Sequence, residues 1–142
     1  MFDKHHIWCI FALVNKFRVI YYESDNGHCP VQEFIDDRDL RNQAKIMAYI
    51  ELLEKNGPLL PRPYADILVD GIHELRIKLS GEQIRVLYFF IYENFIILTH
   101  CFRKNSDKVS KAEIEKAKNI RNDFIKRISE INLRRIADNE DL

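Results

Sequence analysis

Apolar residues recur along the chain either at every second position, as in strands, or at intervals of three and four, as in helices. Residues 17–22 (FRVIYY) are β-branched and aromatic and predict a strand, which ends at the turn residues 24–27. Pro30 suits the first turn of a short helix. A longer helix is predicted over residues 39–55, and its apolar stripe consists of Leu40, Ala44, Met47, Ile50 and Leu53.

In the second half of the chain, apolar residues recur mainly at every second position. Asn56-Gly57-Pro58 ends the long helix, and residues 59–71, which contain two more prolines, predict an irregular loop. Three strands of a meander are then predicted at residues 73–79, 84–92 and 95–102. Ser110-Lys111-Ala112-Glu113 is a capping box, in which the serine and glutamate side chains satisfy each other's backbone amides at the start of a final helix.

The predicted element order is therefore β-α-α-β-β-β-α. It indicates an α+β domain whose helices pack on one face of a mostly antiparallel sheet. The chain of 142 residues has the length of one domain, which we place at residues 17–130, between an extension at 1–16 and an acidic tail at 131–142 that is expected to fray after Arg135. The extension contains a short apolar run without a cleavage site. It is interpreted as an extra strand, an unpacked segment or the product of an early start codon, rather than a signal peptide.

The composition narrows the class of protein. A hydrophobic content of 46% suits a packed core and excludes a disordered chain. No apolar run reaches the roughly 18 residues that a membrane-spanning helix needs. Cys9, Cys29 and Cys101 are too far apart for a zinc motif and form no even-numbered disulfide framework, so we expect no metal and a cytoplasmic location. The sequence contains no phosphate-binding glycine loop and no GxSxG motif.

Charge is distributed unevenly along the chain. The formal net charge is zero, with 22 basic and 22 acidic side chains. Residues 73–127, however, carry 12 Lys or Arg against 7 Asp or Glu, and acidic segments flank this basic region. Such a region favours either a localised positive face for a phosphate-rich ligand or an ordinary solvated surface of mixed charge.

The first two meander strands place three cations on one face. Side chains alternate along a strand, so Arg76 and Lys78 share one side of the first strand. A loop of two or four residues centred on residues 81–82 pairs Lys78 with Arg85, whereas a loop at 80–81 pairs Arg76 with Arg85. All of these loops put the three side chains on the same face.

The next turn extends this face. A two-residue turn at 93–94 places Phe102 opposite Arg85 and His100 opposite Leu87. His100 is therefore interpreted either as a member of the basic face or as an ordinary structural histidine.

The energetics of the three cations favour a ligand. Like charges opposed across strands destabilise a sheet by up to about 1 kcal/mol, and Glu74 alone cannot neutralise three cations. A bound phosphate backbone neutralises them, and arginine binds phosphate oxygens with two parallel hydrogen bonds. Arg103, Lys104 and Lys108 follow the last strand and suit phosphate contacts, or solubility alone.

Three segments carry a resemblance to a known family. HELRIK at residues 73–78, RVLYF at 85–89 and LTHCFRK at 98–104 resemble the toxins of the RelE/HigB superfamily, in particular its phage-derived, HigB-like branch. The order of the predicted elements also matches, and the resemblance covers about residues 17–128. It implies the RelE-like microbial RNase toxin fold.

The resemblance also implies a function. Members of this family are the toxins of type II toxin–antitoxin systems and cleave mRNA, usually on the ribosome, without a metal ion or other cofactor. The expected partners are mRNA, the ribosome and a small helix-turn-helix antitoxin. Arg76, Lys78 and Arg85 match the residues that hold the scissile phosphate, and Arg103 with Lys104 matches the basic pair after the last strand.

These matches suggest a division of roles. Arg76 and Arg85 are expected to clamp the phosphate and to stabilise the charge that builds up in the transition state. Lys78 is expected to favour the ionised 2′-oxygen or the phosphate, and either His100 or Lys104 to protonate the leaving 5′-oxygen. RNA is expected to contact Phe102, Arg103 and Lys108 as well.

Three alternatives stay open at this point. The same basic face suits a non-enzymatic module that binds RNA or DNA. Relatives of the gyrase-poisoning kind have the same fold without the RNase residues, although the Arg76, Lys78 and Arg85 set argues against that interpretation. An inactive remnant of a phage gene is the third alternative.

Overall fold

The computed structural model describes residues 16–140. The first half of the chain forms the strand β1 (Arg18–Tyr21), the helices α2 (Pro30–Asp36) and α3 (Leu40–Asn56) and a short 3-10 helix, η1 (Gly57–Leu59). The second half forms the strands β2 (Ala65–Val69), β3 (Ile72–Leu79), β4 (Glu82–Ile91) and β5 (Phe95–Arg103) and the helices α4 (Lys111–Arg127) and α5 (Glu130–Glu140). No helix within residues 16–140 combines the length and the apolar character needed to cross a membrane.

The five strands form one mixed sheet in the order β1-β5-β4-β3-β2. β1 runs parallel to β5, and the other three neighbouring pairs are antiparallel. The predicted α+β class and the mostly antiparallel sheet are therefore confirmed.

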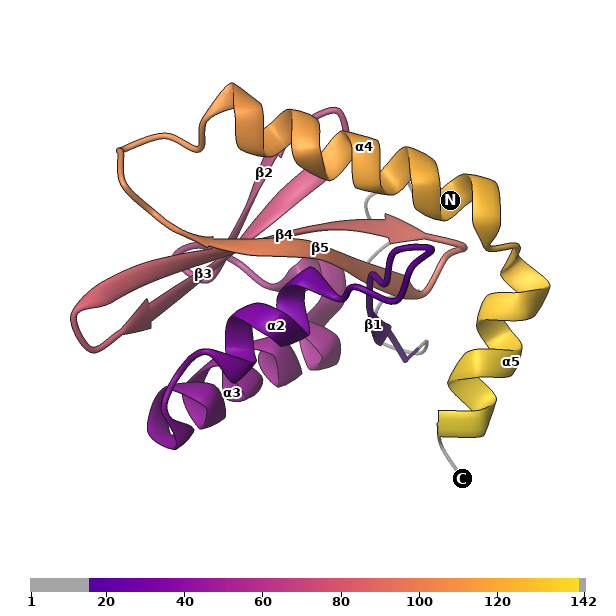
Figure 1. The fold of residues 1–142 in the computed structure, drawn as a ribbon, viewed down its shortest axis with the longest axis horizontal. Helices are drawn as coiled ribbons and strands as arrows, with labels where there is room; N and C mark the ends of the chain where they lie inside the picture. The colour runs from indigo at the N-terminus through magenta and orange to yellow at the C-terminus, as the bar shows by residue number, and fades with distance from the viewer. Residues whose placement is uncertain (1–15, 141–142) are drawn as a thin grey trace, which may run out of the picture.

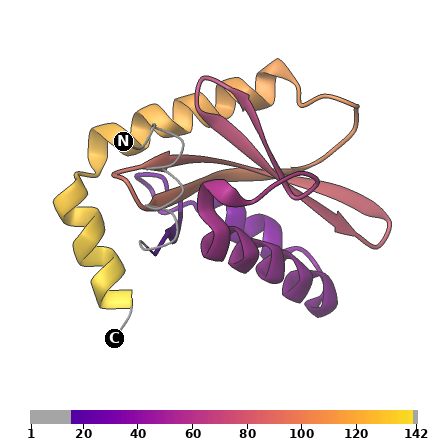
Figure 2. The ribbon, with the colours of Figure 1, turned by 180° about the vertical axis from the view of Figure 1, so that it is seen from behind.

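Helices cover both faces of this sheet, so the prediction that they pack on one face is wrong. The helices α2 and α3 lie on one side and α4 on the other (Figure 1), and the view from behind shows the same three layers (Figure 2). One core forms between α2, α3 and the sheet, and a second core forms between the sheet, α4 and α5. The physical reason is visible in β4, where Val86 and Tyr88 belong to the first core and Leu87 and Phe89 to the second. A strand that is apolar on both faces needs a cover on both.

Two elements lie where the sequence predicted none. β2 occupies part of the segment interpreted as a loop, where Ala65 pairs with Leu75 of β3. α5 occupies most of the segment interpreted as a frayed tail, and its Leu133 and Ala137 are buried in the second core. The expectation for residues 1–16 falls almost entirely on residues 1–15, which lie outside the described part of the chain.

The helix α3 agrees with its predicted bounds but buries a different stripe. Asp39 caps its start by accepting the N–H of Asn42 at 2.8 Å, and Gly57 ends it with a φ of +52°. The fully buried residues are Ile46, Ile50 and Leu53, at spacings of four and three. Leu40 and Met47, by contrast, are 82% and 46% exposed, because the stripe that begins at Ile46 turns a neighbouring side of the helix toward the sheet.

The register of the meander fixes the positions of the charged residues. Arg76 pairs with Arg85 and Lys78 with Gln83, which corresponds to the predicted loop at residues 80–81. Phe102 pairs with Arg85, as predicted.

The turn between β4 and β5 is one residue longer than predicted. Ile91 pairs with Phe95, so residues 92–94 form the turn. A bulge then inserts Thr99 between the Leu98 and His100 pairings, which restores the predicted partnership of Leu87 with His100.

Candidate functional site

Arg76, Lys78 and Arg85 lie on one face of the β3–β4 hairpin, as the alternation of side chains predicts. This is the face that α4 covers further along the sheet, since Leu87, two residues after Arg85, belongs to the second core. We call Arg76, Lys78, Arg85 and Lys104 the basic cluster. Lys104 joins it because its N–H donates to the carbonyl oxygen of Gln83 at 2.8 Å, which continues the strand pairing by one residue.

Arg85 lies at the base of the basic cluster and is only 5% exposed. Its Nη1 donates to the carbonyl oxygen of Ile84 at 3.1 Å, and its Nε lies 3.5 Å from Oε2 of Glu74. Within residues 16–140, the Arg85 Nε is the buried side-chain polar atom recorded without a hydrogen bond. Burial lowers the pKa of Arg85 from its usual value, and the nearby Glu74 carboxylate opposes that shift. A buried guanidinium whose Nε is in ion-pair contact with a carboxylate but makes no hydrogen bond keeps hydrogen-bonding capacity for an anion.

Two carboxylates balance the arginines. The buried Glu74 accepts a hydrogen bond from Arg76 Nε at 2.8 Å in addition to its contact with Arg85. Asp66 of β2 lies 3.3 Å from Arg76 Nη2 and 2.9 Å from Arg62 Nη2. The sequence analysis missed Asp66 because it interpreted β2 as a loop, and it therefore counted Glu74 as the only counter-charge.

The lysines in and beside the basic cluster, unlike its arginines, have no carboxylate partner among the described residues. No ion pair joins Lys78, Lys104 or Lys108 to any acidic side chain within residues 16–140. Lys78 and Lys108 are exposed and Lys104 is half-buried. The uncompensated positive charge of the site therefore belongs to its lysines, whereas its arginines are already paired.

Arg76 and Arg85 line two adjoining hollows of about 270 Å³ each. The first, which we call the loop hollow, lies toward the segment between β5 and α4, and also contains Asp66, Glu74, Lys104, Asp107 and Lys108. The second, which we call the edge hollow, also contains Tyr49, Pro63, Tyr64, Lys78 and Gln83. The same two arginines thus line both hollows.

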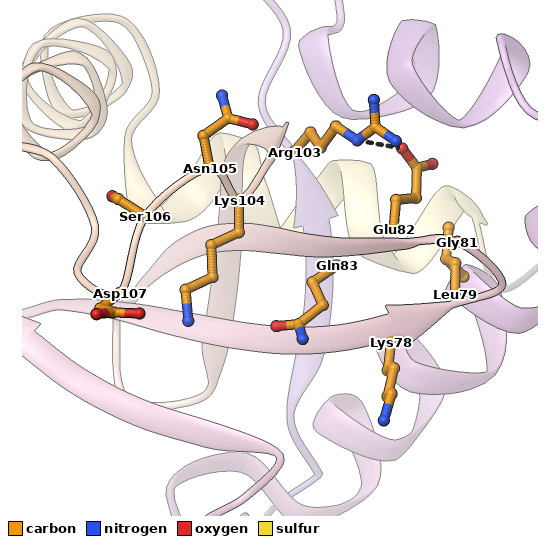
Figure 3. Close-up of a pocket in the computed structure, with 10 residues that line it drawn as sticks. All are labelled: Lys78, Leu79, Gly81, Glu82, Gln83, Arg103, Lys104, Asn105, Ser106 and Asp107. Carbon is orange, nitrogen blue, oxygen red and sulfur yellow. Dashed lines mark ion pairs between the residues drawn. The ribbon is translucent and has the colours of Figure 1, made fainter.

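A third hollow, of about 540 Å³, opens at the tip of the β3–β4 hairpin (Figure 3). Its lining includes two neighbouring basic residues, Arg103 and Lys104, whose side chains point in different directions. The side chain of Lys104 extends across β4, between those of Asp107 and Gln83, whereas that of Arg103 turns toward Glu82. Arg103 Nε lies 3.2 Å from Oε2 of Glu82, a carboxylate that also accepts a hydrogen bond from Arg38. Arg103, which was predicted to contact RNA beside Lys104, lines this third hollow with Lys104 but lines neither of the hollows that contain Arg85.

His100 is 1% exposed and lies beneath the start of α4. Its Nε2 is 2.6 Å from Oε2 of Glu113, and its Nδ1 is 3.0 Å from Oγ1 of Thr99. Burial lowers the pKa of His100, and the contact with Glu113 partly offsets this shift. The imidazole shares the face of the basic cluster by register but lines neither hollow that contains Arg85.

Glu113 has a different partner from the one predicted. Ser110 caps α4 by accepting the N–H of Glu113 at 3.3 Å, as the capping box requires. The Glu113 carboxylate, however, contacts His100 instead of returning to the cap. The pair joins α4 to β5, and the intervening segment, which carries Lys104 and Lys108, is thereby held at both ends.

Phe102 is half-buried and stacks obliquely on His100, with ring centroids 5.6 Å apart. It stands opposite Arg85 in the sheet but lines neither hollow that contains that arginine. Within residues 16–140 the structure gathers no group of three or more His, Cys, Asp or Glu side chains placed to hold a metal ion.

Comparison with known proteins assigns the chain to a family. Residues 33–122 match the family described as phage derived protein Gp49-like (DUF891). Because this match covers more than half of the chain, the protein belongs to the Gp49-like family, which is a toxin-like, phage-derived family related to the RelE/HigB type II toxins. No curated protein matches the chain. The matched region includes every residue of the basic cluster.

Proposed function

We propose that the protein is the toxin of a type II toxin–antitoxin system and that it is an endoribonuclease that cleaves mRNA on the ribosome. The observation that carries this proposal is the pair of arginines that line both hollows, with the Arg85 Nε lacking a hydrogen bond. The relationship of the Gp49-like family to RelE/HigB toxins supports it. The HigB-like branch assigned from sequence is part of the same proposal.

The proposed reaction uses the ribose 2′-hydroxyl of the RNA as its nucleophile. The 2′-oxygen loses its proton to solvent and forms a bond to phosphorus, while the bond from phosphorus to the 5′-oxygen breaks. The products are a 2′,3′-cyclic phosphate and a 5′-hydroxyl. This chemistry needs a positioned phosphate and stabilisation of the negative charge on its oxygens, which cationic donors provide.

Each member of the basic cluster has a role in this proposal. Arg76 and Arg85 hold the non-bridging oxygens of the scissile phosphate, and Lys78 stabilises the ionised 2′-oxygen. Lys104 protonates the leaving 5′-oxygen. Between the two candidates for this last role, the structure favours Lys104 because it lines the loop hollow, whereas both ring nitrogens of His100 face other side chains.

The partners belong to the proposal as well. We propose a cytoplasmic protein that a helix-turn-helix antitoxin keeps inactive, and that works without a cofactor. These expectations rest on the relationship of the Gp49-like family to type II toxins. The discovery of a gene for a short helix-turn-helix protein next to the gene for this chain would support them.

The test is cleavage of mRNA on translating ribosomes, read as breaks at defined codon positions. The wild type is compared with Arg85→Ala and with Arg85→Lys, which keeps the charge but not the planar fork of donors. Loss of one such donor is expected to lower the cleavage rate by about 10²–10³. Cleavage and growth inhibition by a folded Arg85→Ala variant at the wild-type level contradict the proposal.

The burial of His100 favours a second candidate function. An RNase often uses an accessible imidazole as acid or base, and the imidazole of His100 is not accessible. In this case the protein binds nucleic acid without cutting it. The same experiment separates the two candidates, since a binding module leaves the message intact. Its affinity for RNA then falls steeply as the salt concentration rises.

A further inference from the structure

The edge hollow lies where the edge of the sheet becomes open. β2 pairs with β3 as far as Leu75, and the last contact is the N–H of Arg76, which donates to the carbonyl oxygen of Tyr64 at 2.8 Å. Before Tyr64 the chain turns away at Pro63, so within residues 16–140 no strand covers the final residues of β3. Because backbone groups alternate along a strand, the N–H of Lys78 points to this open edge, as that of Arg76 does.

Two aromatic residues line this hollow. Tyr64 is 41% exposed, which is unusual for a large ring, and its centroid lies 6.4 Å from that of Tyr49 on α3, with the two ring planes at 53°. Pro63 adds a third flat, apolar surface. These groups come from two separate parts of the chain, the helix α3 and the segment before β2.

Cations and an amide line the same hollow. Arg76, Lys78 and Arg85 line the edge hollow together with Gln83. The Gln83 side chain has a donor and an acceptor, so it can pair with the edge of a nucleobase. A hollow lined by both flat rings and phosphate-binding cations has the two features that recognise a nucleotide in single-stranded RNA.

We infer that the edge hollow is a nucleobase subsite, in which a base next to the scissile phosphate stacks on Tyr64. This inference rests on the proposed function, because Arg76 and Arg85 hold the scissile phosphate there. It adds to that function the group that orients the neighbouring nucleotide. Tyr49 supports the Tyr64 ring from α3, and Gln83 faces the edge of the base. The ligand is a base of an RNA strand, and the loop hollow takes the nucleotide on the other side of the phosphate.

The test measures binding of a short RNA that contains 2′-deoxyribose at the scissile position and so cannot be cut. Tyr64→Ala is expected to weaken binding by about 5- to 100-fold, which is the effect of losing one stacked base, and Tyr64→Phe to retain it within about twofold. The matched control is Leu59→Ala, because Leu59 is 40% exposed in the same region but does not line the edge hollow. With an RNA that lacks the base at the stacked position, the wild type and Tyr64→Ala are expected to bind equally.

The outcomes separate this subsite from the proposed activity, because the RNA is not cut in the assay. Weaker binding of Tyr64→Ala supports the subsite, whether or not the protein cleaves natural RNA. If Arg85→Ala weakens binding and Tyr64→Ala does not, the subsite is wrong and the proposed function stands. If Tyr64→Phe binds as weakly as Tyr64→Ala, or if the wild type binds no RNA, the inference is overturned.

Discussion

Arg76 and Arg85 stand directly opposite each other in the β3–β4 ladder, and the buried carboxylate of Glu74 contacts both. Two like charges in this position destabilise a sheet, and a carboxylate between them offsets the repulsion. The arrangement keeps two guanidinium groups side by side before any ligand arrives. An RNA phosphate that binds there has to compete with Glu74 for the same donors.

This competition predicts opposite effects of Glu74→Gln on stability and on RNA binding. The free energy of unfolding is expected to fall by about 1–3 kcal/mol, because Arg85 loses its buried counter-charge. The affinity for a non-cleavable RNA is expected to rise by about fivefold, because the phosphate no longer faces a nearby negative charge. Urea unfolding and RNA titration measure the two effects. Asp66→Asn, at the more exposed partner of Arg76, is expected to cost less stability, and equal losses in both variants contradict the prediction.

A second prediction compares two neighbouring basic residues. Lys104→Met is expected to lower the cleavage rate by about 10²-fold or more, because the leaving oxygen loses its proton donor. Arg103→Met is the matched control, since Arg103 pairs with Glu82 and lines neither hollow that contains Arg85. Its cleavage rate is expected to stay within about threefold of the wild type. Equal losses in the two variants would show that the basic pair acts as a whole.

The hairpin could be predicted from the sequence because its geometry is local. Alternation along two strands and a short loop suffice to place Arg76, Lys78 and Arg85 on one face. The turn at residues 92–94 was predicted one residue too short, but the Thr99 bulge returned Phe102 and His100 to their expected partners.

The parts of the site that were missed depend on distant contacts. Asp66 joins Arg76 only because β2, a short strand after two prolines, adds to the edge of the sheet. Glu113 has an ordinary role in a capping box, and nothing near it in the sequence indicates that its carboxylate reaches His100. Tyr49 and Tyr64 come together only when α3 packs on the sheet. Local patterns contain no information about such pairs.

A third prediction concerns pH and His73. Its imidazole stacks on Tyr88 with centroids 5.2 Å apart, and burial lowers its pKa below the usual 6.5. The folded state therefore holds this imidazole neutral, whereas the unfolded chain takes up a proton near pH 6.5. Stability is highest above that pH and falls as the pH decreases below it, by at most about 1.4 kcal/mol per pH unit for one group.

The measurement is the free energy of unfolding from pH 7.5 to pH 5.0. His73→Phe keeps a ring against Tyr88 but cannot titrate, so its stability is expected to fall less over this range than that of the wild type. His100, whose pKa is lowered in the same direction, remains in both proteins and contributes equally. An unchanged pH dependence in His73→Phe would contradict the lowered pKa of His73.

A fourth prediction tests the junction between α3 and β1. A Cβ atom at Gly57 would lie 2.6 Å from the ring of Phe17, and the φ of +52° disfavours any side chain there. Gly57→Ala is expected to cost more than about 2 kcal/mol of stability, through both the close contact and the backbone strain. Gly81→Ala is the control, because its φ of +82° carries a similar strain but no atom lies within 4 Å. Thermal unfolding of the two variants separates the contact from the strain.

The last prediction concerns the chemistry of cleavage. If the ribose supplies the nucleophile, 2′-deoxyribose at the scissile position abolishes cleavage while leaving binding to the basic cluster intact, since Arg76 and Arg85 contact the phosphate. The 5′ fragment is expected to end in a 2′,3′-cyclic phosphate, which mass spectrometry distinguishes from a 3′-hydroxyl by its extra phosphate. Cleavage that continues on the 2′-deoxy substrate would require a nucleophile other than the ribose and would remove the role assigned to Lys78.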